Sequence, residues 1–155
     1  MPISIAIEDP AEPDLVAILR AHLAQMRAQS PPESVHALDL DGLRDPAVTF
    51  LALRDDGRAL AVGALKRLGA REGEIKSMHC LAASRGRGFG VAMLERLLGL
   101  ARERGMVRLF LETGATDDFL PARSLYARHG FVACGPFADY PAHPFSAFMT
   151  LELPD

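Results

Sequence analysis

The sequence predicts an α/β protein with a mixed, mostly antiparallel sheet of about seven strands and helices on both of its faces. Two observations predict this class. Three short apolar runs in the middle of the chain are separated only by turn residues, which is typical of an antiparallel meander. The third run then leads through a glycine-rich loop into an amphipathic helix and another apolar run, and strands joined in this way are parallel.

The N-terminal part predicts one strand and one long helix. Alternating isoleucines over Ile3–Ile7 predict the strand. Asp9 and Glu12 have the spacing of a capping box, so we expect a helix to begin there. The buried face of that helix is marked by residues at helical spacing: Leu15, Ile18, Leu19, His22, Leu23 and Met26. The prolines in Ser30–Ser34 end it, and a short helical or irregular piece reaches about Arg44.

The meander is predicted over Val48–Leu53, Ala59–Leu68 and Glu74–Leu81. Asp55–Gly57 and Gly69–Gly73 contain the glycines and acidic residues expected of the two turns. These short connections leave room only for antiparallel neighbours.

The C-terminal half alternates helices and strands. The helix after the glycine-rich loop has one apolar face and ends at Gly105, a natural C′ residue. Val107–Thr113 predicts a strand, and Pro121–His129 a helix that Gly130 closes. Two further runs complete the sheet: Phe131–Ala133 and Ala147–Leu153.

Composition limits the classes of protein and of partner. A chain of 155 residues is about one domain long, and its net charge of −3 does not indicate a nucleic-acid binder. Cys80 and Cys134 form no CxxC pair and lie among apolar neighbours, which favours the reducing cytoplasm. The N-terminus lacks the pattern of a signal peptide, and no apolar run reaches the roughly 18–20 residues of a membrane span. We therefore expect a cytoplasmic protein with neither nucleic acid nor membrane as partner.

The loop Arg85–Gly90, "RGRGFG", predicts a site for a phosphate or pyrophosphate. The first N–H groups of a helix have no partner within the helix, and the helix dipole makes that end positive. Glycines let the backbone approach an anion, and the two arginines add charge-assisted hydrogen bonds. A glycine-rich turn with two surface arginines is the alternative interpretation of the loop alone.

Two common phosphate loops do not fit these residues. A Walker loop ends in Gly-Lys-Ser/Thr, but Gly90 is followed by Val91 and Ala92. The dinucleotide fingerprint requires a third glycine, which would fall at Val91 or Met93. The loop also follows the fourth predicted strand, whereas a dinucleotide fold places it after the first.

Arg85–Gly90 resembles instead the Gln/Arg-x-x-Gly-x-Gly/Ala signature of the GNAT family of N-acetyltransferases. In that family the signature lies between the fourth strand and the next helix and holds the pyrophosphate of acetyl-coenzyme A. "ARSLYARHGF", Ala122–Phe131, is similar to the later Ala-x-x-Leu-Tyr-x-x-x-Gly-Phe segment. "SPPESVHALD", "LETG" and "FMTLEL" look like an uncharacterised bacterial branch. The resemblance covers Ile3–Leu153 and implies the GNAT fold and a single N-acetyltransferase domain over residues 1–155.

The resemblance implies acetyl-coenzyme A as cosubstrate and no metal. In the family the fourth strand splays from the fifth, and its exposed backbone binds the pantetheine and the acetyl carbonyl. The cofactor-binding residues it implies are Met78, Cys80, Arg85, Gly86, Arg87, Gly88, Phe89, Gly90 and Val91. Many members carry an Asn that contacts the cofactor where this chain has Phe119. We expect that contact to be lost or to be supplied by another group, such as Thr113 or Arg123.

For catalysis the resemblance implies Tyr126 as the general acid and Glu74 as the general base, often acting through water. The alternatives are a core tyrosine and an edge glutamate in a polar turn. Strand alternation places His79 on the opposite face from Glu74, so we expect His79 to be a packing or capping residue.

The acceptor site is predicted from its place in the fold: Glu33, His36, Glu112 and the loop Asp139–Ser146. Solvated loop charges are the alternative interpretation of these residues. The function implied is acetyl transfer to the primary amine of a small molecule, by direct transfer in a ternary complex. The alternatives are a protein or peptide acceptor and a coenzyme A-binding module without catalysis. Dimers are common in the family, so the resemblance allows a homodimer.

Overall fold

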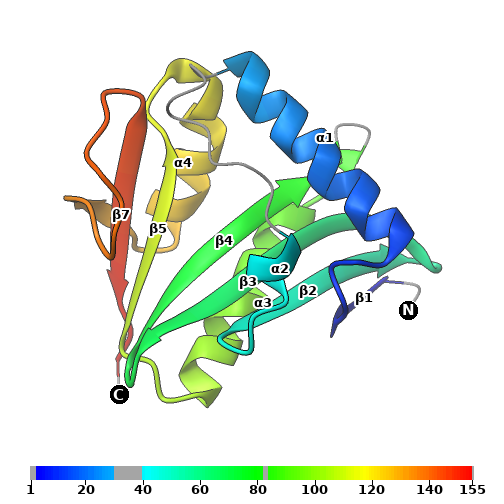
Figure 1. Cartoon of the computed structure of the whole chain (residues 1–155), viewed down its shortest axis with the longest axis horizontal. Coiled ribbons are helices and arrows are strands. Elements are labelled where there is room, and N and C mark those ends of the chain that lie inside the picture. The colour runs from blue at the N-terminus through cyan, green and yellow to red at the C-terminus, as the bar shows by residue number, and fades with distance from the viewer. Residues whose placement is uncertain (1–2, 30–39, 82–83, 155) are drawn as a thin grey trace.

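The computed structural model describes residues 3–29, 40–81 and 84–154, and their strands form one seven-stranded sheet in the order β1-β2-β3-β4-β5-β7-β6. Helices cover both faces of this sheet, with α1 and α2 on one side and α3 on the other (Figure 1). The predicted class is therefore confirmed. The elements are β1 (Ile3–Ile7), α1 (Pro13–Gln29), α2 (Leu40–Leu43), β2 (Val48–Asp55), β3 (Arg58–Gly69), β4 (Glu72–Cys80), α3 (Phe89–Glu103), β5 (Arg108–Gly114), the 3-10 helix η3 (Asp117–Phe119), α4 (Leu120–Arg128), β6 (Val132–Cys134) and β7 (Ser146–Glu152).

Two hydrophobic cores hold the helices to the sheet. Alternate residues of β3 point to opposite cores, because side chains of a strand alternate between faces. Val62 and Ala64 pack with α1 and α2, whereas Ala61 and Leu65 pack with α3. Tyr126 of α4 belongs to the α3 core. The face of each strand residue thus decides on which side of the sheet its side chain acts.

The strands β4 and β5 separate soon after they meet. They are parallel, as predicted from the intervening helix, but they pair only over Glu72–Glu74 with Arg108–Phe110. Beyond that point the two strands diverge toward the top of Figure 1. The splay implied by the family resemblance is therefore present.

A β-bulge interrupts β4 at Ser77, whose φ is +56°. The register with β3 passes from Ala64↔Lys76 to Val62↔His79, so two residues of β4 stand opposite the single residue Gly63. Residues paired across a ladder point to the same face of the sheet, and Val62, Ala64 and Lys66 share one face of β3. Their partners His79, Lys76 and Glu74 therefore share a face as well. The prediction that His79 faces away from Glu74 is wrong, because the bulge adds one residue to the alternation.

The predicted capping box is also wrong. Helix α1 begins at Pro13, one residue beyond Glu12. The Asp9 carboxylate instead accepts a hydrogen bond of 3.0 Å from the backbone N–H of Ala11. Asp9 therefore stabilises the turn before the helix.

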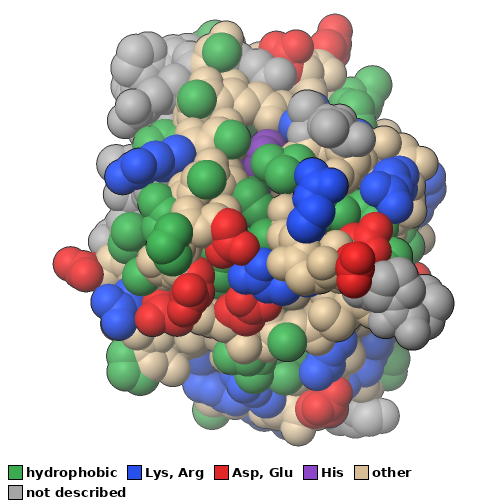
Figure 2. All heavy atoms as spheres, turned by 90° about the vertical axis from the view of Figure 1, so that its right-hand side faces the viewer, with side chains coloured by type: hydrophobic (Ala, Val, Ile, Leu, Met, Phe, Trp, Pro, Cys, Tyr) green, Lys and Arg blue, Asp and Glu red, His purple; other side chains and the backbone are tan. Residues whose placement is uncertain are grey.

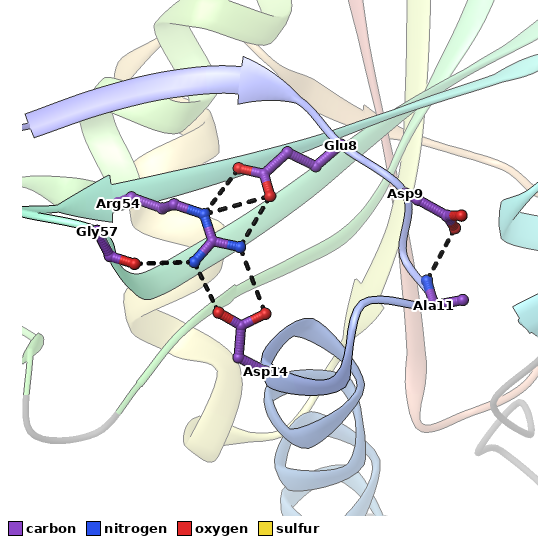
Figure 3. A network of polar contacts seen from close by, with 6 residues as sticks. All are labelled: Glu8, Asp9, Ala11, Asp14, Arg54 and Gly57. Carbon is purple, nitrogen blue, oxygen red and sulfur yellow. Dashed lines mark hydrogen bonds and ion pairs between the residues drawn. The ribbon is translucent and has the colours of Figure 1, made fainter.

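Arg54 ties together three segments that are distant in the sequence (Figure 3). Its guanidinium Nη2 lies 2.8 Å from Glu8 Oε1, just after β1, and its Nη1 lies 2.6 Å from Asp14 Oδ2 in the first turn of α1. Nη1 also donates to the carbonyl of Gly57 in the β2–β3 turn. The Arg54 side chain is only 20% exposed. Its hydrogen bonds lower the pKa of Asp14.

On the face shown in Figure 2, acidic and basic side chains are interspersed, and no extended basic patch is visible. Within the described ranges, no helix is both long and apolar enough to cross a membrane.

We predict that Arg54→Met lowers the free energy of unfolding by about 1–2 kcal/mol, because two carboxylates lose a partly buried partner. Denaturant unfolding at pH 7 measures this loss. Arg58→Met is the matched control, since Arg58 is exposed on the same hairpin, and it should change stability by less than about 0.5 kcal/mol. Because the pKa of Asp14 is lowered in the folded state, the difference between wild type and Arg54→Met should shrink as the pH falls below about 4. Equal losses in the two variants would contradict this assignment.

Candidate active site

A cavity of about 680 Å³ opens where β4 and β5 diverge. Its wall combines residues of α1, α2, β4, β5, the loop before α3, and α4. It is lined both by residues of the α3 core, such as Met93 and Tyr126, and by Leu19 of the α1 core. The gap between the strands thus joins the two faces of the sheet in one chamber.

The glycine-rich loop forms the entrance to α3 and lies on the cavity wall. Gly86 and Gly88 have φ values of +80° and +82°, a left-handed conformation that favours glycine, and Gly88 is the N-cap of α3. Apart from the chain neighbours, no described residue has an atom within 4 Å of a Cβ added at either position, so the backbone is open toward the described part of the chain. Gly90 differs, because it is a helical residue beside Leu125 of α4. Only two of the three glycines are therefore required by the shape of the loop.

The two arginines of the loop have different roles. Arg85 lines the cavity, where its Nη2 donates a 2.6 Å hydrogen bond to Gln25 of α1 and its Nε donates to the carbonyl of Cys80. Arg87 pairs at 3.4 Å with Asp55, and its guanidinium lies 4.7 Å from the centre of the Phe89 ring. Neither Arg87 nor Val91, which is 37% exposed, belongs to the cavity wall. Met78, Cys80 and the remaining predicted loop residues do.

These residues fit the diphosphate group of coenzyme A. The N-terminus of α3, a helix of fifteen residues, lies here, and its first N–H groups have no partner within the helix. The backbone at Gly86 and Gly88 is open, and the guanidinium of Arg85 lies on the same wall. The divergence of β4 from β5 also leaves the backbone of Ser77–Cys80 without a partner strand on that edge in the described ladder. An extended amide-containing chain can pair with such an edge.

Tyr126 is buried in the α3 core yet contributes to the cavity wall. Its ring packs edge-on against Phe131, with 5.8 Å between the ring centres. Its hydroxyl makes no hydrogen bond with the part of the chain that the structure describes. Burial raises the pKa of this phenol, so it stays protonated at neutral pH and can donate to a ligand.

Glu74 is 3% exposed and lies on the cavity wall, unlike a glutamate in a polar turn. Its Oε2 accepts a 2.7 Å hydrogen bond from the Tyr140 hydroxyl and lies 3.6 Å from Lys76 Nζ. Lys76 Nζ in turn donates to the Tyr140 oxygen at 3.1 Å. Burial, then the bond to Glu74, raises the pKa of Tyr140. Both contacts of Glu74 end on Oε2, which leaves Oε1 for water or a ligand.

His79 stacks on His22 of α1, with 4.6 Å between the ring centres and an angle of 16° between the planes. The prediction of a packing histidine is therefore confirmed. Burial, reinforced by nearby Arg85, lowers the pKa of His22 to about 4. Burial, then His22 and Arg85, lowers that of His79 to about 3. Both imidazoles are neutral at physiological pH.

Phe119, where the family often has Asn, packs its ring directly on Gly114 at the end of β5. Arg123 is not among the residues of the cavity wall, and its Nη1 donates to the carbonyls of Gly114 and Thr116 at 2.6 and 2.9 Å. Thr113 lies on the cavity wall and is the remaining polar candidate.

The predicted acceptor residues are only partly brought together. Glu112 lies on the cavity wall, whereas Glu33 and His36 lie outside the described residues. Sequence reasoning missed Lys66 and Lys76, which also line the cavity. The sequence prediction included Tyr140 only as part of the loop Asp139–Ser146. The positions of the two lysines depend on the register between strands, and that of Tyr140 depends on the loop lying beside Glu74 of β4. No local sequence pattern reveals either. Among the described residues, no three His, Cys, Asp or Glu side chains gather as metal ligands would.

Comparison with known proteins agrees with this geometry. A sequence profile described as the acetyltransferase (GNAT) family matches residues 15–131. The chain is 44% identical over 149 residues to the uncharacterised N-acetyltransferase YsnE of Bacillus subtilis, covering 96% of this chain and 99% of that protein. It is 34% identical to an IAA acetyltransferase of Azospirillum brasilense, covering 97% and 98%. A crystal structure assigned as an acyl-CoA N-acyltransferase of Klebsiella pneumoniae superposes with a TM-score of 0.80 at 29% identity, covering 97% of each chain.

We predict that Gly88→Ala weakens coenzyme A binding about tenfold, because an L-residue in the left-handed region costs roughly 1–2 kcal/mol and the loop must distort to relieve it. Calorimetric titration with coenzyme A measures the dissociation constant. Gly99→Ala is the control, since Gly99 lies inside α3 with open space around it, and it should leave the constant within twofold. An unchanged constant in Gly88→Ala would show that the loop does not hold the anion.

We also predict that acid destabilises the protein through the histidine pair. The folded-state pKa values lie below the ordinary 6.5, so the unfolded chain binds more protons as the pH falls from about 6.5 toward 4, and stability is lost over that window. Thermal unfolding of wild type and His79→Phe between pH 7.5 and 4.5 measures the slope, which should be shallower in the variant. Gly99→Ala, which removes no titratable group, should keep the wild-type slope. Parallel curves for wild type and His79→Phe would contradict the assignment.

Proposed function

This chain belongs to the GNAT family of acetyltransferases, and we propose that it transfers the acetyl group of acetyl-coenzyme A directly to the primary amine of a small molecule in a ternary complex. One observation carries the proposal. A single cavity joins the glycine-rich loop and Tyr126 to Glu74 through the gap between β4 and β5. A donor held at the loop and an acceptor held near Glu74 would share that chamber, as direct transfer requires.

Acetyl-coenzyme A supplies an acetyl group activated as a thioester. The residues that would hold it are the N–H groups of Arg85–Gly90 at the start of α3, together with the Arg85 side chain. The backbone of Met78 and Cys80 would bind the extended part of the molecule along the free edge of β4. The side chain of Cys80 has no catalytic role in this proposal, and burial raises the pKa of its thiol.

Glu74 would accept the proton that the attacking amine must lose. An amine with a pKa near 10 is mostly protonated at neutral pH, so an acceptor beside it speeds the reaction. Tyr140 and Lys76 hold Oε2 and so fix the carboxylate, while Oε1 stays available to water or the amine. The Lys76 ammonium, 3.6 Å from Oε2, places a positive charge beside this carboxylate.

Tyr126 would give a proton to the departing thiolate. Its raised pKa keeps the proton on the hydroxyl until a strong base forms beside it. Packing against Phe131 fixes the ring, so the hydroxyl need not be ordered at each turnover.

Two features support a small acceptor and a cytoplasmic site of action. Side chains of α1, α2 and the loop bearing Tyr140 and Phe145 line the cavity together with Glu74, on the side of the sheet where the acceptor would bind (the acceptor side). A concave site built from several elements suits a small molecule. Cys80 and Cys134 are both free thiols, which suits a reducing compartment.

The direct experiment offers a panel of amines, amino acids and peptides to the protein with acetyl-coenzyme A and measures thiol release. Free small amines should promote release, and peptides at equal concentration should promote much less. Coenzyme A binding confirmed by thermal shift, with no release on any acceptor, would leave a binding module and overturn the catalytic proposal.

We predict that Tyr126→Phe lowers kcat about a hundredfold while leaving the dissociation constant of coenzyme A within threefold, because only the proton donor is removed. Steady-state kinetics on the best acceptor, with calorimetry for coenzyme A, separates the two effects. The ring contact with Phe131 is retained, so thermal unfolding should be unchanged. A kcat equal to that of wild type would assign Tyr126 to the core alone.

A further inference from the structure

Lys66 is a cation on the acceptor side of the cavity that the proposed chemistry does not use. It stands opposite Glu74 in the ladder between β3 and β4 and opposite Val48 in the ladder between β2 and β3. It follows Val62 and Ala64 on the face that α1 covers, and it lines the cavity. In the part of the chain that the structure describes, its ammonium makes no hydrogen bond or ion pair with a side chain. This half-buried charge can therefore serve a ligand.

The neighbouring charges are already matched to one another. Lys76 pairs with Glu74, whose second contact is Tyr140. Glu112, on the same face of β5 as Phe110, lies on the opposite wall of the gap and acts electrostatically on Tyr140. Beyond the Glu74–Lys76 pair, the acceptor side thus offers the cation Lys66. A zwitterion could place its carboxylate at Lys66 and its amine near Glu74, whereas a simple amine would leave Lys66 facing an apolar or cationic ligand.

Resting on the proposed function, we infer that the acceptor carries a carboxylate beside its amine, and that Lys66 binds this carboxylate. The acceptor class is then an amino acid. The ammonium of Lys66 orients the molecule from β3, so that its amine end is directed along β4 toward Glu74 and the gap. A monoanion is favoured over a phosphate, because one ammonium balances one negative charge and the adjacent Glu74 and Glu112 would repel a second.

The test compares the standard L-amino acids with their carboxamides as acceptors. A carboxamide keeps the amine and the side chain but lacks the negative charge. Its amine is also the weaker base, so more of it is unprotonated at pH 7.5, and intrinsic reactivity favours the amide. We expect the best acid to have a kcat/KM at least tenfold above that of its amide, and Lys66→Met to raise the KM of the acid at least tenfold. The amide should have the same KM with wild type and Lys66→Met.

Arg58→Met is the matched control, because it removes one cation from the exposed start of the same strand and should alter neither constant. If turnover occurs but acids and amides are equivalent, or if Lys66→Met raises both KM values alike, the inference is overturned and the proposed function stands. If no acceptor releases thiol, the proposed function fails. In that case, calorimetry measures the binding of amino acids to the coenzyme A-loaded protein and still tests the inference. Weaker binding to Lys66→Met than to wild type would support it. No binding to wild type, or equal binding to both, would overturn it.

Discussion

The separation of β4 from β5 is the constraint on which the rest of the structure depends. Two parallel strands that stayed paired would close the sheet and leave no chamber between its faces. Here the ladder stops after three residue pairs, and the bulge at Ser77 bends β4 just beyond that point. Gly63, opposite the bulge, leaves room for α3, because a Cβ there would lie 2.9 Å from Met93 and Leu97 and 3.1 Å from Met78. The absence of a side chain at this position thus lets α3 and Met78 pack closely on β3.

Because of this opening, the residues that line the cavity come from both faces of the sheet. The glycine-rich loop and Tyr126 belong to the side of α3 and α4, whereas Glu74, Lys76 and Lys66 belong to the side of α1 and α2. In the proposed reaction, donor and acceptor would therefore bind on opposite sides of the sheet and meet in the gap. The neutral His22–His79 pair fills the α1 side of the gap without adding charge.

Much of this architecture could be predicted from the sequence, because the order of apolar runs, turns and glycines determines strand neighbours. The glycine-rich loop was recognisable because its signature is local, although the sequence could not show that Gly90 is an ordinary helical residue and that Arg87 pairs with Asp55. The errors lie where tertiary packing overrides a local pattern. The bulge at Ser77 reversed the face predicted for His79, and the capping box failed because α1 begins at Pro13, three residues after the first helical position that an N-cap at Asp9 requires. Lys66 was missed because its neighbours come from other strands.

The most direct test of the central claim, that coenzyme A lies in the gap between β4 and β5 with its phosphates at the loop, is amide hydrogen exchange with and without the ligand. Coenzyme A should slow exchange at Arg85–Val91 and along Ser77–Cys80, because both sets of N–H groups would gain acceptors. The edge strand β1 should be unaffected. Protection confined to other segments, with exchange in the loop and in β4 unchanged by saturating coenzyme A, would contradict the account.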